Sequence, residues 1–184
     1  MNGNTRAEYG SSKADYARLR GRYTPKHPKI IFVLESPPIS GKYFYNPEGR
    51  TTEPLFSAMM KDVLGLSPRT KHEGLTEFAA HGYLLVDATY TPVNIPGPAR
   101  VRDKAAAAQI QKDFPLLVAE LHKQGQTGTK LLLVKSNVCR LLRTPLTQQG
   151  FVVLNDNLAI PFPSNGQQTR FRKMVRQVLG LDYI

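Results

Sequence analysis

Two carboxylates, Glu35 and Asp87, lie at the ends of short apolar runs. Glu35 follows KIIFVL (29–34), and Asp87 is near the end of GYLLVDA (82–88). A Glu at a strand end can orient or deprotonate a water molecule, or stabilise a nearby cation. An Asp at the end of a second strand can accept a hydrogen bond from a ring N–H. The structural alternatives are that Glu35 caps a loop amide or pairs with a basic neighbour, and that Asp87 caps the following turn.

Three consecutive aromatic residues, Tyr43, Phe44 and Tyr45, lie in the polar loop that follows Glu35. We expect one or two of them to turn inward and at least one to remain available for stacking on a planar base. Such stacking is worth about 1–3 kcal/mol per base and tolerates any base sequence. The alternative is that two of the rings anchor the loop onto the sheet, which suits Tyr45 best.

A third polar segment follows the run KLLLV (130–134). Lys135, Ser136 and Asn137 open a short helix there, and Ser136 is its expected N-cap. A helix start of this kind also binds phosphate, and capping is compatible with phosphate contact. We therefore predict that these three residues contact DNA.

The last loop contains Phe162, Ser164 and Asn165 and leads into a strongly basic segment. Cations at a helix N-terminus are unfavourable with the helix dipole, which favours a phosphate partner that compensates them. The alternative is an ordinary amphipathic helix with a solvated basic face. The cations are Arg170, Arg172, Lys173 and Arg176.

The charge of the whole chain also favours a polyanionic partner. Its 184 residues include 25 Lys and Arg against 14 Asp and Glu, a formal net charge of +11. Nucleic acid suits such a surface because binding releases condensed counterions. Solubility alone is the alternative explanation, but the clustering of the charges near the C-terminus favours DNA.

Composition excludes several classes of protein. No apolar run is long enough to span a bilayer, and the polar N-terminus lacks the apolar core of a signal peptide, so we expect a cytoplasmic protein, nucleoid-associated if bacterial. The single Cys139 can form neither an internal disulfide nor a four-cysteine iron–sulfur site. The four His lack zinc-ligand spacing. We expect no metal, no cofactor and no membrane partner.

Strand-like runs alternate with helical segments along the chain. This order predicts an α/β fold, a three-layer sandwich with a central four-stranded, mostly parallel sheet flanked by helices. Ligands of such sheets bind beyond the carboxyl ends of the strands, which is where the four polar loops lie. We expect one domain over 1–184, a monomer, with residues 1–28 as a helical extension packed on it. The strand-like runs are 29–34, 82–88, 130–134 and 151–162, and the helical segments are 13–22, 53–66, 102–125 with a start or kink at Pro115, 136–142 and 170–181.

From about Lys29 to the C-terminus, the order of these motifs resembles the uracil-DNA glycosylase superfamily. Asp87 stands where much of that family carries a base-reading Asn, and Phe162 stands in place of the His of its His-Pro-Ser-Pro loop. Leu34 replaces the usual first Gly of the first motif, and Ser36 stands where some branches keep a water-binding Asp or Asn. The motifs that carry the resemblance are KIIFVLESPP, Phe44 with FSAMMKDVLGL, GYLLVDATYTP, KLLLVKSNVCRLL and Phe162-Pro163-Ser164-Asn165.

The resemblance implies a DNA repair enzyme that flips uracil out of single- or double-stranded DNA and hydrolyses its N-glycosidic bond. Glu35 and Ser36 are the expected catalytic residues. Tyr43 or Phe44 would stack on the base, and Asp87 would accept from its ring N–H. Pro37, Phe162, Ser164 and Asn165 complete the expected pocket, while Arg170, Arg172 and Lys173 would grip the strand.

Two other functions fit the same sequence. A non-catalytic DNA-damage-binding module on the same scaffold is favoured by the missing His. A small-molecule or nucleotide hydrolase with a flavodoxin-like sheet is the third hypothesis, and the absence of a phosphate-binding glycine loop counts against it.

Overall fold

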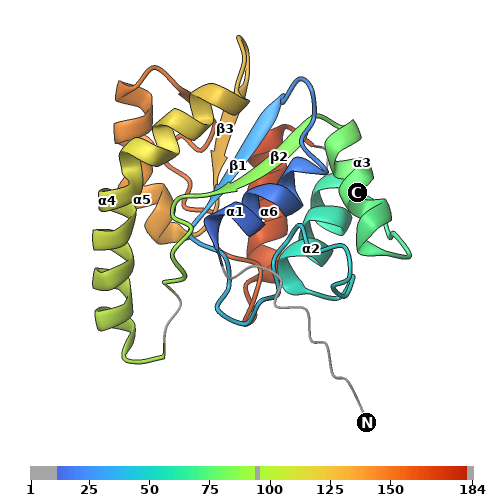
Figure 1. Ribbon diagram of the computed structural model, residues 1–184, viewed down its shortest axis with the longest axis horizontal. Coiled ribbons are helices and arrows are strands. Elements are labelled where there is room, and N and C mark those ends of the chain that lie inside the picture. Colours follow the sequence, from blue (N-terminus) through green and yellow to red (C-terminus); the bar gives the residue numbers. More distant parts are fainter. Residues whose placement is uncertain (1–11, 94–95, 182–184) are drawn as a thin grey trace.

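The computed structural model describes residues 12–93 and 96–181, and they form a three-layer α/β sandwich around a four-stranded, all-parallel sheet (Figure 1). The strand order is β2-β1-β3-β4, so the first strand in the chain lies inside the sheet. The predicted sheet and its helical layers are therefore confirmed. The strands are β1 (Ile30–Leu34), β2 (Tyr83–Asp87), β3 (Lys130–Leu133) and β4 (Val152–Val153).

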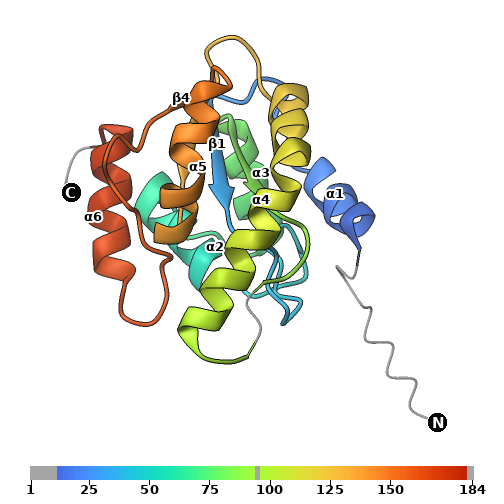
Figure 2. The same ribbon diagram turned by 90° about the vertical axis from the view of Figure 1, so that its left-hand side faces the viewer.

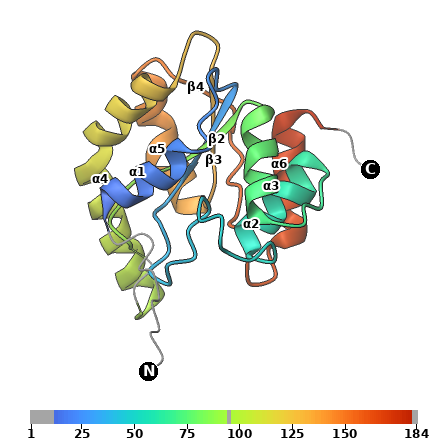
Figure 3. The ribbon, with the colours of Figure 1, turned by 45° about the vertical axis from the view of Figure 1, so that its right-hand side comes forward.

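Helices cover both faces of the sheet. Figure 3 shows α1, α4 and α5 on one side and α2, α3 and α6 on the other. The short α2 continues directly into a π-helix, η1, which also contacts α6. The helices are α1 (Lys13–Gly21), α2 (Pro54–Ala58), η1 (Met59–Leu64), α3 (Lys71–Ala80), α4 (Ala99–Gln124), α5 (Ser136–Gln148) and α6 (Gln168–Leu179).

The central strands are apolar on both faces because both faces are covered. Ile31, Phe32 and Val33 of β1 are completely buried. The register pairs Leu34 with Asp87, so β1 and β2 end side by side. This alignment brings the loops that follow the strands together at one edge, the lower edge in Figure 2.

The fourth predicted strand is much shorter than expected. Only Val152–Val153 forms β4, and the remainder of 154–162 is irregular. Asn155 explains the early end: its Oδ1 accepts from the Leu133 N–H at 2.7 Å, and its Nδ2 donates to the Leu133 carbonyl at 2.9 Å. The side chain thereby replaces the backbone partner that a longer β4 would supply.

Three helices differ from the predicted segments. Helix α3 was not among the predicted segments, and α5 continues to Gln148 through Pro145, beyond the predicted end at residue 142. Helix α4 starts at Ala99 and continues through Pro115, so the helix does not start at that proline. Figure 1 shows α4 changing direction along its length, as an internal proline predicts.

The N-terminal helix is confirmed. Ser12 caps α1 by accepting from the Asp15 N–H at 3.2 Å, and Tyr16 and Leu19 are buried against the core. The predicted extension also includes residues 1–11, which lie outside the described residues. Within the described part of the chain, no helix combines the length and apolar character needed to cross a membrane.

Candidate active site

A cavity of about 600 Å³ opens at the carboxyl edge of the sheet. All four loops that follow the strands contribute to it, as the topology of a parallel sheet predicts. Ten of the predicted site residues line this cavity, and the other five do not. The ten are Glu35, Ser36, Pro37, Tyr43, Phe44, Asp87, Lys135, Phe162, Ser164 and Asn165.

Glu35 is a buried carboxylate with a donor on each oxygen. Lys135 Nζ donates to its Oε2, and Asn137 Nδ2 donates to its Oε1. Only 7% of Glu35 is exposed. The basic neighbour considered as a structural alternative is thus present, and it lies inside the cavity. These two donors fix the orientation of the carboxylate.

Asn137 is a buried residue whose side chain is already hydrogen-bonded. It is 9% exposed, its amide is used by Glu35, and its Oδ1 accepts from the Val138 N–H at 2.8 Å. In this structure Asn137 serves to position Glu35, and its direct contact with DNA stays a prediction. The sequence could not reveal its true neighbour, because 102 positions separate it from Glu35.

Lys135 has an unusual backbone conformation, with a φ of 84°. A non-glycine residue in this region is strained, and such strain persists where the surrounding structure enforces it. Here the Lys135 N–H donates to the Ile160 carbonyl at 2.8 Å, which ties the third loop to the fourth. Lys135 is itself the cap position of α5, and Ser136 is its first helical residue. The expectation that Ser136 is the N-cap is therefore wrong.

Asp87 is a buried acid with an unused oxygen. It is 3% exposed, and within the described part of the chain neither its Oδ2 nor the Tyr43 hydroxyl has a hydrogen-bond partner. Burial raises the pKa of Asp87 to about 8, and the negative charges of Glu120 and Glu35 act in the same direction. Asp87 is therefore mainly protonated at neutral pH and can donate as well as accept.

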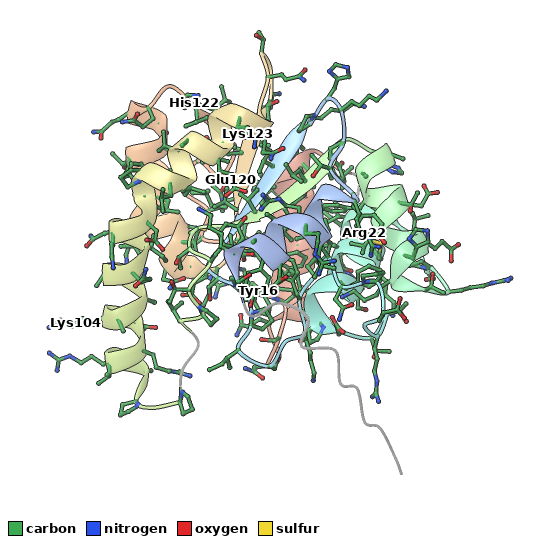
Figure 4. The ribbon with its side chains drawn as sticks, viewed as in Figure 1. Tyr16, Arg22, Lys104, Glu120, His122 and Lys123 are labelled. Carbon is green, nitrogen blue, oxygen red and sulfur yellow. The ribbon has the colours of Figure 1, made fainter. Side chains whose placement is uncertain are left out.

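A buried ion pair lies close enough to Asp87 to influence its pKa. Arg20 of α1 pairs with Glu120 of α4 and also donates to the Tyr90 hydroxyl, which in turn donates to Glu120 at 3.0 Å. Figure 4 shows Glu120 on the side of α4 that faces α1. The positive charge of Arg20 partly opposes the rise in the pKa of Asp87. Arg20 and Glu120 could not be recognised from the sequence, since no local pattern connects them.

All three rings of the aromatic loop turn inward, whereas we expected only one or two of them to do so. Tyr43, Phe44 and Tyr45 are 2%, 3% and 0% exposed. Tyr45 anchors the loop, as considered above, because its hydroxyl accepts from the Leu85 N–H at 2.7 Å. Phe44 packs edge-on against Phe78 at 5.3 Å between ring centroids. Tyr43 and Phe44 still border the cavity, so stacking remains available only to a group that enters it.

The first and second loops are also tied to each other and to α3. Ser36 Oγ accepts from the Val93 N–H at 3.2 Å. The fully buried Lys71 Nζ donates to the Tyr43 carbonyl and to Glu53 Oε2, each at 2.9 Å. Lys71 therefore fixes the loop that carries the aromatic rings, a role that a lysine in a helix does not reveal from sequence.

The fourth loop forms the remaining wall. Ser164 N–H donates to the Phe162 carbonyl at 2.8 Å, and Asn165 has a φ of 50° before Gly166 at 80°, which makes a tight turn. The half-buried Phe162 faces the cavity with a ring that cannot donate a hydrogen bond. The wall at this position is therefore apolar.

The basic residues of α6 lie outside the cavity. Arg172 Nε donates to Asp62 Oδ1 of η1 at 2.6 Å, and Arg176 donates to the Asp62 carbonyl at 3.2 Å. Arg172 thus has a structural partner, although 63% of its side chain is exposed. Arg170 and Lys173 are exposed on the same helix. Two cations that were not predicted, Lys42 and Arg102, line the cavity together with Glu53 and Asp103.

Within residues 12–93 and 96–181, no group of three or more His, Cys, Asp or Glu side chains is arranged to hold a metal ion. No family model matches the chain, and no curated protein or solved structure is detectably similar to it.

Proposed function

We propose that this protein is a DNA repair glycosylase that flips uracil out of DNA and hydrolyses its N-glycosidic bond, leaving an abasic site. The observation that carries the proposal is the position of Glu35. Its carboxylate is held by two donors and lines the same cavity as Asp87, whose Oδ2 has no hydrogen-bond partner within the described residues. Aromatic walls between them suit a planar base.

The cavity accepts a nucleotide only when it leaves the base stack, because the reacting atom is unreachable inside a duplex. The volume of about 600 Å³ is within the range of small-molecule pockets. Tyr43, Phe44 and Phe162 provide apolar surface, and the net charge of +11 attracts the phosphate backbone. Lys42 and Arg102 are placed to contact phosphates next to the flipped nucleotide.

Asp87 reads the polar edge of the base in this proposal. Uracil presents a ring N–H beside a carbonyl, and a protonated carboxyl complements both, with its C=O accepting and its O–H donating. The Tyr43 hydroxyl is a second unused group for the same edge. When Asp87 is ionised it can only accept, so it still pairs with the uracil N–H but repels the lone pair on the corresponding nitrogen of cytosine.

Glu35 acts at the sugar. As the bond from C1′ to the base nitrogen breaks, its electron pair leaves with the base and C1′ becomes cationic. The Glu35 carboxylate stabilises this cation and takes the proton of the water that adds to C1′. Lys135 provides a positive charge beside the departing uracil anion, at a site where Phe162 cannot supply one.

The assay is release of free uracil from oligonucleotides that contain one uracil, single- or double-stranded. The proposal predicts release, and no release from either substrate by the folded protein would refute it. A non-catalytic DNA-damage-binding module is the second candidate, and the apolar Phe162 wall favours it. That candidate predicts salt-dependent binding without base release.

A further inference from the structure

Two lysines of the described residues line the cavity, and their surroundings differ. Lys42 is exposed on the first loop, whereas Lys135 is half-buried just after β3. The Nζ of Lys135 donates to Oε2 of Glu35, which lines the same cavity. An amine in contact with a carboxylate has beside it a group that can take its proton, which is how a nucleophile is activated.

The backbone of Lys135 is fixed on both sides of its side chain. Its N–H donates to the Ile160 carbonyl at 2.8 Å, and its carbonyl accepts from the Cys139 N–H at 3.0 Å as α5 begins. On the opposite side of the ion pair, Asn137 Nδ2 holds the other oxygen of Glu35. The amine and the carboxylate are therefore held together, while 37% of the Lys135 side chain remains exposed.

The proposed reaction makes a substrate that suits this amine. Hydrolysis at C1′ leaves an abasic sugar whose ring opens to an aldehyde at that same carbon. Glu35 is proposed to act at C1′, and Lys135 contacts Glu35, so the amine lies beside the new aldehyde. Lysine amines condense with carbonyl carbons to form imines.

We propose that Lys135 forms an imine with C1′ of the abasic site and that this intermediate cleaves the DNA strand on its 3′ side. The protein would then have a lyase activity in addition to base release. The inference rests on the proposed function, because its substrate is the abasic sugar bound in the same cavity.

The imine forms with a balance of protons that Glu35 and Lys135 supply themselves. Glu35 takes one proton from the Lys135 ammonium, and the lone pair of Nζ adds to the aldehyde carbon. The aldehyde oxygen collects a second proton from the nitrogen and the proton held by Glu35, and it leaves as water. A protonated imine and the Glu35 carboxylate remain.

Strand cleavage follows as an elimination. The Glu35 carboxylate takes a proton from C2′, and the electron pair of that C–H bond forms a double bond between C2′ and C3′. The bond from C3′ to oxygen breaks, and the phosphate leaves with its electron pair. Water then hydrolyses the imine and frees Lys135, and Glu35 releases its proton to solvent.

The test uses DNA with one abasic site prepared beforehand, and sodium borohydride, which reduces an imine to a stable amine. The wild type becomes covalently attached to this DNA, and without borohydride it cuts the strand. After digestion with nuclease and trypsin, the adduct lies in peptide 131–140, which contains Lys135, because trypsin does not cut at a modified lysine. An adduct in peptide 30–50, which contains Lys42, or the absence of an adduct or of strand cleavage, overturns the proposal. The mapping uses the wild type and needs no variant to fold.

A conservative variant tests the amine itself. Lys135→Arg keeps a positive charge and N–H donors for Glu35, but a guanidinium that stays protonated does not form an imine. It lowers the amount of trapped protein at least about 100-fold, as expected when a nucleophile is removed. The matched control is Lys104→Arg, an exposed lysine of α4 labelled in Figure 4, which traps as much as the wild type. Equal trapping by Lys135→Arg and the wild type overturns the proposal.

Uracil release, measured in parallel, separates this inference from the proposed function. A wild type that traps and cuts prepared abasic sites but releases no uracil refutes the glycosylase and leaves the lyase standing. A wild type that releases uracil but neither traps nor cuts abasic DNA refutes the lyase alone.

Discussion

Glu35 and Lys135 form an ion pair across the carboxyl edge of the sheet, although 100 positions separate them in the chain. Glu35 follows β1 and Lys135 follows β3, and these two strands are neighbours. The strained backbone of Lys135 directs its side chain to this partner. The pair orients the carboxylate without closing the cavity, since 37% of the Lys135 side chain remains exposed.

The free energy of unfolding should depend on pH through Asp87. Its folded pKa of about 8 is raised above the ordinary value of 3.8, so the folded state binds a proton that the unfolded state releases. Stability is therefore highest below pH 4 with respect to this group and falls as pH rises to about 8, by at most about 1.4 kcal/mol per pH unit. In urea unfolding, the free energy of unfolding of Asp87→Asn minus that of the wild type should increase from pH 5 to pH 8. A constant difference across this range contradicts the assignment.

Base selectivity should also change with the ionisation of Asp87. The protonated acid pairs with the edges of both uracil and cytosine, whereas the carboxylate accepts only from uracil. The ratio of affinities for oligonucleotides that present uracil or cytosine should therefore rise as pH increases through about 8. Asp87→Ala should lose both the selectivity and its pH dependence. If this variant discriminates as well as the wild type, Asp87 does not read the base.

Lys71 should be necessary for the stability of the aromatic loop. Its fully buried Nζ donates hydrogen bonds to the Tyr43 carbonyl and to Glu53, and Lys71→Met removes the donor from both acceptors. The loss should be about 3 kcal/mol in the free energy of unfolding, which is typical of breaking one side of a buried pair. The control is Lys104→Met, an exposed lysine on the outer side of α4 in Figure 4, with an expected change below about 0.5 kcal/mol. Equal effects of the two variants contradict a structural role for Lys71.

Arg170 should contribute to DNA affinity through phosphate contact. It is exposed at the start of α6, and unlike Arg172 it is not bonded to Asp62. Arg170→Ala should weaken duplex binding and reduce the slope of log affinity against log salt by about 0.9. Lys123→Ala, at the far end of α4 in Figure 4, should leave the slope unchanged. A slope that neither substitution alters argues against α6 as a DNA-binding element.

The parallel sheet and the location of the cavity could be predicted because both follow from local patterns. Continuous apolar runs indicated buried strands, and parallel topology placed their following loops at one edge. Helix α3 was not predicted because Gly74 and the small number of apolar residues weaken its periodicity. Its start could have been recognised from Thr70, whose Oγ1 accepts from the Glu73 N–H at 3.1 Å.

The polar partners at the site could not be predicted in the same way. Asn137 looked like an exposed helix start, and only the packing of α5 against β3 turns it toward Glu35. The pKa of Asp87 also depends on the positive charge of Arg20 in α1, which is far from Asp87 in the sequence. Long-range contacts of this kind decide the charge state of a carboxyl group, and local spacing does not encode them.

The most direct test of the proposed function is uracil release by the wild type and by Glu35→Gln, with DNA affinity measured for both. The wild type should release free uracil, and Glu35→Gln should release it at least about 100-fold more slowly while binding the same oligonucleotide with similar affinity. A wild type that binds DNA but releases no uracil, or a Glu35→Gln variant as active as the wild type, contradicts the proposed role of Glu35.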